Sequence, residues 1–444
     1  MSIRNKKSLT VGAGVVAVGM FAVGCGAGPA PANNNAATTN ATQGGGAPAS
    51  ASIVWAAPPI TNTGLRKTLI AEFEKAYPNI KVTLQDQNNN SDTNRASLTT
   101  AIGGGASTPD VYLADVVWPA QFANSKLALP LDENVSKSFW DRFAGGLVDG
   151  ATYKGHIYGA PFFADSGFLF YRKDLLQQAN LPVPTSWAQL QQEAETLQKK
   201  GLVQYGFAWQ GASYEGLTCD FMEYLADAGG KVLDSNGQAA IDSPEAAKAL
   251  NFMKGLISSG VSPKAEVTFQ ENESMNLFDQ GKVAFLRNWP YAWNNSQTST
   301  DSKVVGKVGV APLPTFGQGG AGYSTVGGWD LMVNPHTQNM KAALTFIDWM
   351  TGKDAQTILA TKYGEIPTNA AVQQDPAVKK VSPVFGVVSE IHYIARPSQT
   401  PNYPQVSQAI YSNVNQALAG GTSVANALKQ AQQQINSAVS SSGL

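Results

Sequence analysis

Apolar and polar positions after residue 52 follow two alternating periods, which predict strands and helices in turn. Ile53 to Trp55 is a short apolar run that predicts a buried strand. Apolar residues then recur at helical spacing from Leu65 to Tyr77, and Pro78 ends that helix. The stretch from Ile80 to Leu84 alternates as a second strand. A strand, a helix and a strand in so short a span predict a βαβ unit, and therefore a parallel sheet.

The same two periods recur along the rest of the chain. Apolar runs predict further strands at residues 111–117, 283–286, 308–310 and 331–333. Helical spacing with start and stop signals predicts helices at residues 186–201, 243–260, 340–350 and 423–439. The alternation of strands and helices predicts an α/β fold and leaves the order of the strands open.

The first 24 residues differ from the rest of the chain. Three basic residues among the first seven precede an uncharged stretch from Leu9 to Val23 that is rich in Val, Ala and Gly. This order is typical of a secretory signal peptide, which we assign to residues 1–24. A transmembrane anchor is the alternative, but the stretch is shorter than the roughly 20 residues that a spanning helix needs.

Cys25 follows the small residues at the end of this stretch. The arrangement resembles the lipobox of bacterial lipoproteins, in which the thiol receives a diacylglyceryl group. The segment from Gly26 to Ser52 has no charged or aromatic residue, so it cannot bury enough apolar surface to fold by itself. Residues 25–51 are therefore predicted to be a lipidated cysteine and a flexible linker. We expect the folded body at the extracellular face of the cell membrane, or in the periplasm where an outer membrane is present.

The composition fits a globular body after the linker. The 444 residues are 43% hydrophobic, with a formal net charge of −1 and a pI near 6.3. A near-neutral chain gives no electrostatic reason to expect nucleic acid as a partner. Cys219 has no disulfide partner if Cys25 carries lipid, so we expect a small buried thiol. The length predicts roughly two lobes.

Several short segments occur in the order expected for one family. Residues 159–165 (Gly-Ala-Pro-Phe-Phe-Ala-Asp) and 169–176 (Leu-Phe-Tyr-Arg-Lys-Asp-Leu-Leu) resemble a stretch of the family 1 extracellular solute-binding proteins of ABC importers. Arg172 stands where that family usually has Asn. The further segments that resemble the family are Pro184–Trp187, Phe278–Phe285, Gly327–Trp329 and Arg396–Pro397. The resemblance covers the chain from Ser52 onward.

This resemblance implies a two-lobed fold of the periplasmic-binding-protein type, with a hinge and a ligand cleft between the lobes. One lobe is expected to comprise residues 52–161 and 325–370, and the other residues 162–324 and 371–444. The hinge crossings are then expected near Pro161, near Ser324 and past Pro367.

The tryptophans are candidates for covering the apolar faces of a sugar. Trp118, Trp289, Trp293 and Trp329 lie beside Gly, Pro or Asn, which predicts loops, and Trp rings suit stacking platforms. The alternative is that these rings are core residues at the lobe edges.

Two carboxylates are candidates for pairing with sugar hydroxyls. Asp115 follows a predicted strand at the end where open α/β sheets bind ligands, and Asp165 lies at the expected hinge. We expect them to accept hydrogen bonds from one sugar, from opposite lobes. The alternative is that either carboxylate caps a helix or pairs with a surface lysine.

Within the family, the order of the candidate residues is most similar to that of the trehalose/maltose-binding proteins. That resemblance implies ligand contacts from Asp115, Phe163, Asp165, Trp289, Gly328, Trp329 and Arg396, with Trp118, Arg95 and Tyr403 as further candidates. The acidic residue that the subgroup has near the first helix is missing at residues 61–63.

Two other patterns carry no prediction of a site. The Gly317–Gly322 segment satisfies G-x-G-x-x-G but lacks the strand-turn-helix setting of a nucleotide site. His156, His336 and His392 lie far apart without Cys or acidic neighbours at ligand spacing, so we expect no metal and no cofactor.

We therefore expect a monomeric binding protein, with no catalytic residue, that delivers a di- or oligosaccharide to the permease subunits of an ABC importer. The alternatives are a lipid-anchored glycoside hydrolase using Asp115 and Asp165, and an ABC binding protein for a non-sugar solute such as a polyol phosphate or polyamine. The lack of an acidic or basic cluster in the sequence argues against a charged solute.

Overall fold

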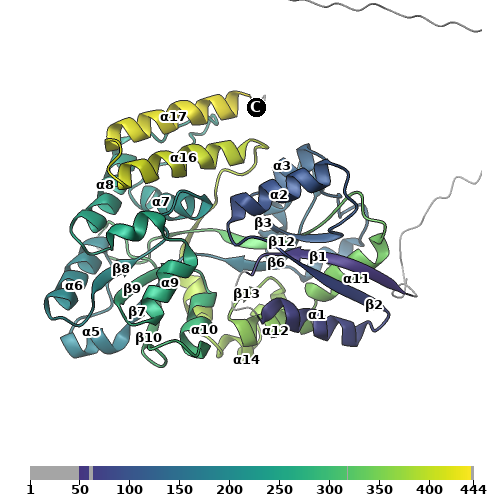
Figure 1. Cartoon of the computed structure of the whole chain (residues 1–444), viewed down its shortest axis with the longest axis horizontal. Helices are drawn as coiled ribbons and strands as arrows, with labels where there is room; N and C mark the ends of the chain where they lie inside the picture. The colour runs from purple at the N-terminus through teal and green to yellow at the C-terminus, as the bar shows by residue number, and fades with distance from the viewer. Residues whose placement is uncertain (1–49, 60–63, 318, 442–444) are drawn as a thin grey trace, which may run out of the picture. The chain divides into compact units, whose positions relative to one another are not determined.

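The computed structural model describes residues 50–59, 64–317 and 319–441. These residues fold around two β-sheets that carry helices on their faces (Figure 1). Within these ranges no helix is both long enough and apolar enough to cross a bilayer. The predicted signal peptide, Cys25 and nearly all of the predicted linker lie outside the described residues.

The first sheet has six strands, and the predicted βαβ unit forms one edge of it. In order across the sheet the strands are β13 (Ile366–Pro367), β6 (Ala160–Asp165), β12 (Gly327–Val333), β3 (Val111–Asp115), β1 (Ala51–Ala57) and β2 (Ile80–Asp86). Strand β1 is parallel to both β2 and β3, so the predicted parallel pairing is confirmed. Strand β12 is antiparallel to β3 and to β6.

Alternate residues of these strands pack on opposite faces of the six-stranded sheet. Trp55 and Leu113 join a cluster with Phe73 and Phe346, whereas Tyr112 joins another cluster on the other face. The helices of the first cluster are α1 (Leu65–Ala76), α11 (Met340–Met350) and α12 (Lys353–Tyr363); those of the second are α2 (Ser91–Gly103) and α3 (Pro119–Asn124).

The second sheet has four strands. Their order is β10 (Val308–Ala311), β7 (Phe168–Arg172), β9 (Val283–Asn288) and β8 (Tyr205–Ala208). The helices around it are α5 (Lys173–Ala179), α6 (Trp187–Lys199), α7 (Glu215–Asp227), α8 (Pro244–Ser258), α9 (Glu271–Asp279) and α10 (Tyr291–Thr298). The C-terminal helices α16 (Tyr403–Leu418) and α17 (Val424–Ser440) pack against each other and against α8 (Figure 1).

The remaining elements are short. They are η1 (Lys137–Arg142), α4 (Leu147–Gly150), β4 (Thr152–Tyr153), β5 (His156–Ile157), η2 (Lys264–Thr268), α13 (Ala370–Gln373), α14 (Pro376–Lys379), α15 (Val384–Val387) and η3 (Val388–Glu390). A separate two-stranded sheet pairs β11 (Tyr323–Thr325) with β14 (His392–Ile394) in parallel.

Every helix and strand predicted from the periodicity is present in the structure. Local signals fixed several boundaries correctly. Ser186 caps α6 by accepting a hydrogen bond from the Gln189 amide, and Ser243 caps α8 ahead of Pro244. Cys219 is a free, buried cysteine on α7, as predicted.

The chain passes between the two sheets at three places. The first passage is Ser166–Gly167, because β6 stays paired with β12 as far as Asp165. It therefore lies a few residues beyond the expected position at Pro161. The second passage joins β11 to β12 near Ser324, and the third follows β13, as expected. The division of the chain into lobes at the predicted boundaries stays a prediction.

Two of these passages are tied to each other and to α7. The Ser324 hydroxyl donates a hydrogen bond to the Gly167 carbonyl at 2.6 Å. The Thr325 amide donates to the Glu223 carboxylate at 3.1 Å, and the same carboxylate pairs with Arg287. A Cβ atom on Gly167 would lie 2.5 Å from Glu223 Oε1 and 2.7 Å from an Arg287 guanidinium nitrogen, so a larger residue would displace this buried ion pair.

Candidate functional site

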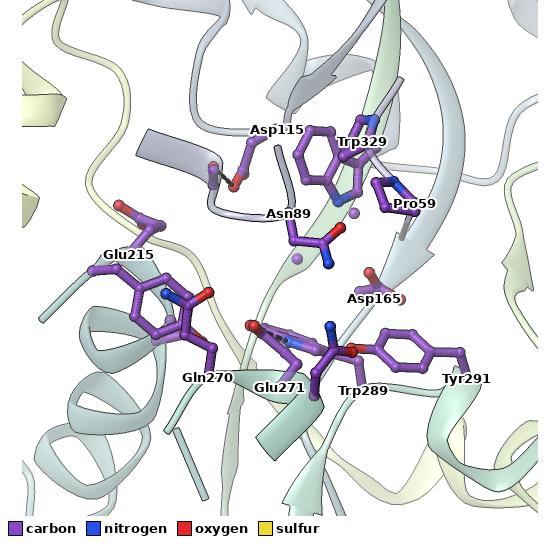
Figure 2. Close-up of a pocket in the computed structure, with 18 of the residues that line it drawn as sticks. Pro59, Asn89, Asp115, Asp165, Glu215, Gln270, Glu271, Trp289, Tyr291 and Trp329 are labelled. Atoms are coloured by element: carbon purple, nitrogen blue, oxygen red, sulfur yellow. Dashed lines mark hydrogen bonds between the residues drawn. The ribbon is translucent and has the colours of Figure 1, made fainter. Parts of the chain in front are cut away.

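A cavity of about 220 Å³ lies where the ends of β3 and β6 and the start of β12 face α7, α9 and β9 (Figure 2). Its walls are aromatic, carboxylate and amide side chains together with glycine backbone. The lining residues are Pro58, Pro59, Asn89, Ser91, Asp115, Asp165, Tyr214, Glu215, Gly216, Cys219, Gln270, Glu271, Asn272, Glu273, Trp289, Tyr291, Gly327, Gly328, Trp329 and Arg396.

One wall is built by three neighbouring strand ends of the six-stranded sheet. Asp115 ends β3 opposite Trp329, and Asp165 ends β6 opposite Gly327. Both carboxylates therefore come from one sheet, and the expectation that they face each other from opposite lobes is wrong. The strand β6 continues to Asp165 beside β12, which places this carboxylate in the same sheet as Asp115.

Gly328 allows the strands of this wall to approach closely. Its φ is +121°, and a Cβ atom would lie 2.5 Å from the carbonyl oxygen of Phe163. Both the backbone conformation and the space therefore require glycine.

The opposite wall comes from elements on the side of the four-stranded sheet. Tyr214 and Glu215 begin α7, Glu271 begins α9, and Tyr291 begins α10. None of these residues was predicted from the sequence. Glu215 lies beyond the carboxyl end of β8, which is the same signal that identified Asp115. Glu271 stands in a capping-box segment, whose pattern indicates only a helix start.

Trp289 and Trp329 line the cavity from the two walls. Trp289 directly follows β9, its ring lies over the Arg287 guanidinium at 4.2 Å, and its Nε1 donates to Glu271 at 3.3 Å. Trp329 is partly buried, and its ring meets that of Trp118 edge-on at 5.7 Å. The prediction that Trp329 lies in a loop is wrong, because it stands within β12. Trp293 likewise lies in α10 rather than in a loop.

Arg396 joins the two walls through buried ion pairs. Its guanidinium donates to Asp115 Oδ1 and to Glu215 Oε1, each at 2.8 Å. The side chains of all three residues are less than a tenth exposed. Asp115 also accepts a hydrogen bond from Ser91 at 3.2 Å. The Asp115 carboxylate is therefore largely occupied by partners within the protein.

Glu215 is held by further hydrogen bonds on α16. The hydroxyls of Tyr403 and Ser407 each donate to its carboxylate at 2.5 Å. Burial raises the pKa of Glu215 to about 7, while the charge of Arg396 opposes this shift.

Asp165 differs from both of these acids because it has no hydrogen-bond partner among the described residues. It is 8% exposed, and its Oδ1 is buried without a partner. Burial, followed by repulsion from Asp115, raises the pKa of Asp165 to about 8. Burial also raises the pKa of Glu271. The ligand-free cavity thus contains a carboxyl group with unused hydrogen-bonding capacity.

Six of the ten predicted ligand contacts line this cavity, and four lie elsewhere. Phe163 is 1% exposed and packs against Phe162 in the core of the six-stranded sheet. Trp118 lies behind Trp329 and stacks on Phe122 at 5.3 Å. Arg95 is 3.6 Å from Asp92 on its own helix. Tyr403 lies behind Glu215, as described above.

The cavity is also more acidic than the sequence suggested. Its five carboxylates belong to Asp115, Asp165, Glu215, Glu271 and Glu273, whereas Arg396 is its one basic lining residue among those described. The lack of an acidic cluster in the sequence therefore does not extend to the folded cavity. Glu271 and Glu273 are neighbours on α9, and the other three acids lie far apart in the sequence, so the sequence shows no cluster. Among the described residues, no group of three or more His, Cys, Asp or Glu side chains could hold a metal ion.

Comparison with known proteins matches this chain to solute-binding proteins. A family model described as bacterial extracellular solute-binding protein matches residues 58–357. A probable ABC transporter-binding protein of Deinococcus radiodurans is 35% identical over 356 residues, which are 78% of this chain and 83% of the relative.

Solved structures give the same picture. The maltose-bound MalE3 of T. maritima is 36% identical, with a TM-score of 0.81 over 87% of this chain and 99% of the other. An ABC transporter solute-binding protein of Thermotoga lettingae bound to α-D-tagatose is 27% identical, with a TM-score of 0.79 over 88% of this chain and all (100%) of the other. The predicted two-lobed α/β fold is confirmed.

Proposed function

Because the chain belongs to the bacterial extracellular solute-binding proteins, we propose that it captures a di- or oligosaccharide of the maltose or trehalose type. It delivers this sugar, as a monomer, to the permease subunits of an ABC importer. The observation that carries the proposal is the cavity that Trp289 and Trp329 line together with several carboxylates.

The chemistry of this cavity suits a carbohydrate. A sugar has apolar C–H faces, which the two indole rings can cover. Its rim of hydroxyls needs acceptors, because each hydroxyl buried without a partner costs about 1–3 kcal/mol. Asp165 and Glu271 supply such acceptors, and Arg396 and Asn89 supply donors. The maltose and tagatose bound by the similar structures support this ligand class.

A thermal-shift screen over mono-, di- and trisaccharides tests the proposal. A bound sugar at 100 times its Kd adds about 2.7 kcal/mol to the free energy of unfolding, which raises the melting temperature measurably. We expect one or a few sugars to do this, and Trp289→Ala to abolish the shift. A melting temperature that no saccharide or alditol in the panel changes would refute the sugar-binding proposal.

We further propose that the protein binds its sugar without converting it. Asp115 is paired with Arg396 and Asp165 has a raised pKa, and the two belong to one sheet rather than to facing walls. Prolonged incubation with maltose and trehalose should therefore release no glucose. Steady glucose formation that Asp165→Asn abolishes would establish a hydrolase instead.

We also propose that Cys25 carries a lipid, although it lies outside the described residues. Cys25→Ala should abolish labelling by a radioactive fatty acid and release the protein from the membrane. Cys219→Ala is the matched control, since it removes the other cysteine and should leave the labelling intact. A Cys25→Ala protein that remains labelled would contradict the lipoprotein proposal.

A further inference from the structure

The cavity contains more carboxyl groups than its own cations can pair with. Arg396 is shared between Asp115 and Glu215, so one guanidinium serves two carboxylates. Arg287 lies behind Trp289, but it pairs with Asp220 at 3.1 Å and with Glu223 at 2.5 Å. Neither arginine is therefore free to neutralise Asp165 or Glu271.

Asp165 is the part of this wall that lacks a partner. Its carboxyl group is more than nine-tenths buried, lines the cavity, and forms no hydrogen bond with the described residues. Figure 2 shows it between the ring of Trp329 and those of Trp289 and Tyr291. A buried polar group without a partner is costly, so a ligand donor at this position would be favourable.

The aromatic rings favour a particular kind of donor. An ammonium group has three N–H donors and no acceptor, and a carboxylate accepts its hydrogen bonds with charge assistance. Aromatic rings attract a cation through their negative faces. A sugar hydroxyl can use the same carboxylate but gains neither the charge nor the interaction with the rings.

Building on the sugar-binding function proposed above, we propose that the preferred ligand is a carbohydrate or alditol that carries a protonated amine, with the ammonium group placed at Asp165 and Glu271. The remaining hydroxyls then bind as in a neutral sugar. The raised pKa of Asp165 is consistent with this, because a bound cation would favour the ionised carboxylate that burial disfavours.

The test compares ligand pairs that differ only by an amine in place of a hydroxyl. The pairs are glucose and glucosamine, sorbitol and glucamine, and trehalose and trehalosamine, measured by titration calorimetry at neutral pH. We expect the amine to bind at least tenfold more tightly in one or more pairs. We also expect the preference to fall with added salt, because ionic screening weakens a charge interaction.

Variants then assign the preference to Asp165. Asp165→Asn should bring the ratio of the two Kd values in a pair close to one, whatever happens to the affinities themselves. Asp330→Asn is the matched control, because Asp330 is a buried carboxyl on β12 that does not line the cavity, and it should leave the ratio unchanged.

The outcomes separate this inference from the proposed function. Neutral members that bind as tightly as their amines, or more tightly, would overturn the amine preference and leave the sugar-binding proposal intact. A preference that survives in Asp165→Asn would also overturn the placement of the ammonium at Asp165. Failure of every saccharide and alditol to bind would refute the sugar-binding proposal itself.

Discussion

Replacing Asp165 by Asn should make the ligand-free protein more stable and its sugar binding weaker. Burial and repulsion by Asp115 raise the pKa of Asp165 from 3.8 to about 8, so the folded protein holds this proton to higher pH than the unfolded chain does. The folded state therefore loses stability as the pH rises from about 4 towards 8, since the unfolded state releases the proton first. Asparagine has the same shape and no charge, so the variant escapes this loss.

The size of the effect follows from the shift in pKa. Each unit corresponds to about 1.4 kcal/mol, which sets an upper limit of about 6 kcal/mol above pH 8. The carboxyl lines a cavity that water can enter, and the folded state can relax around the charge. We therefore expect Asp165→Asn to raise the free energy of unfolding by about 1–3 kcal/mol at pH 8.5. At pH 4 the two proteins should be nearly equal.

Urea unfolding of both proteins from pH 4 to pH 9, without ligand, measures this difference. Calorimetry with the sugar found in the thermal-shift screen should show that the variant loses about 1–3 kcal/mol of binding free energy, through the lost charge-assisted hydrogen bonds. A variant that is less stable than wild type at pH 8.5, or a difference that does not change with pH, would refute the assignment of a buried carboxyl with a raised pKa to Asp165.

Three further substitutions test other parts of the site. Trp329→Ala should weaken sugar binding by about 1.5–4 kcal/mol. It should also lower the free energy of unfolding by about 1–3 kcal/mol, because the ring packs on Trp118. An unchanged sugar affinity would show that Trp329 is not part of the binding site. Arg396→Met should destabilise the protein in urea by about 3–5 kcal/mol by leaving two buried carboxylates unpaired, whereas Arg142→Met, at a more exposed ion pair, should cost under about 1 kcal/mol. Gly328→Ala should lower the melting temperature strongly because its Cβ would meet the Phe163 carbonyl, whereas Gly386→Ala, with open space around it, should have little effect; equal effects would contradict this account of β12.

The elements of the fold were predictable because their signals are local. The alternation at Ile80–Leu84 and the capping serines Ser186 and Ser243 lie within a few residues of what they specify. The order of the strands depends on pairings between distant segments, such as β12 inserted between β3 and β6, and the periodicity contains no such information.

The site was predictable where a residue lies at a strand end or in a family segment, as with Asp115 and Trp289. Trp118 and Phe163 are aromatic residues near strand ends, as Trp289 is. Tertiary packing nevertheless buries both of them behind the residues that line the cavity. Glu215 follows β8 in the same way, but its pairing with Arg396, 181 positions along the chain, leaves no trace in the local sequence.

The two passages that are tied to α7 have a mechanical consequence. Gly167 is bonded to Ser324, and Thr325 is bonded to Glu223, so bending along these two passages is expected at Ser166 and Val326, the single residues that separate them from Asp165 and Gly327. Those two residues line the cavity, so the ligand sits almost on the pivot rather than at the end of a lever arm. A small difference in ligand thickness at a pivot becomes a large displacement at the distant rims. Sugars of different size would therefore hold the outer surfaces of the two lobes at different separations. An importer that contacts only those surfaces would then respond to the ligand without touching it.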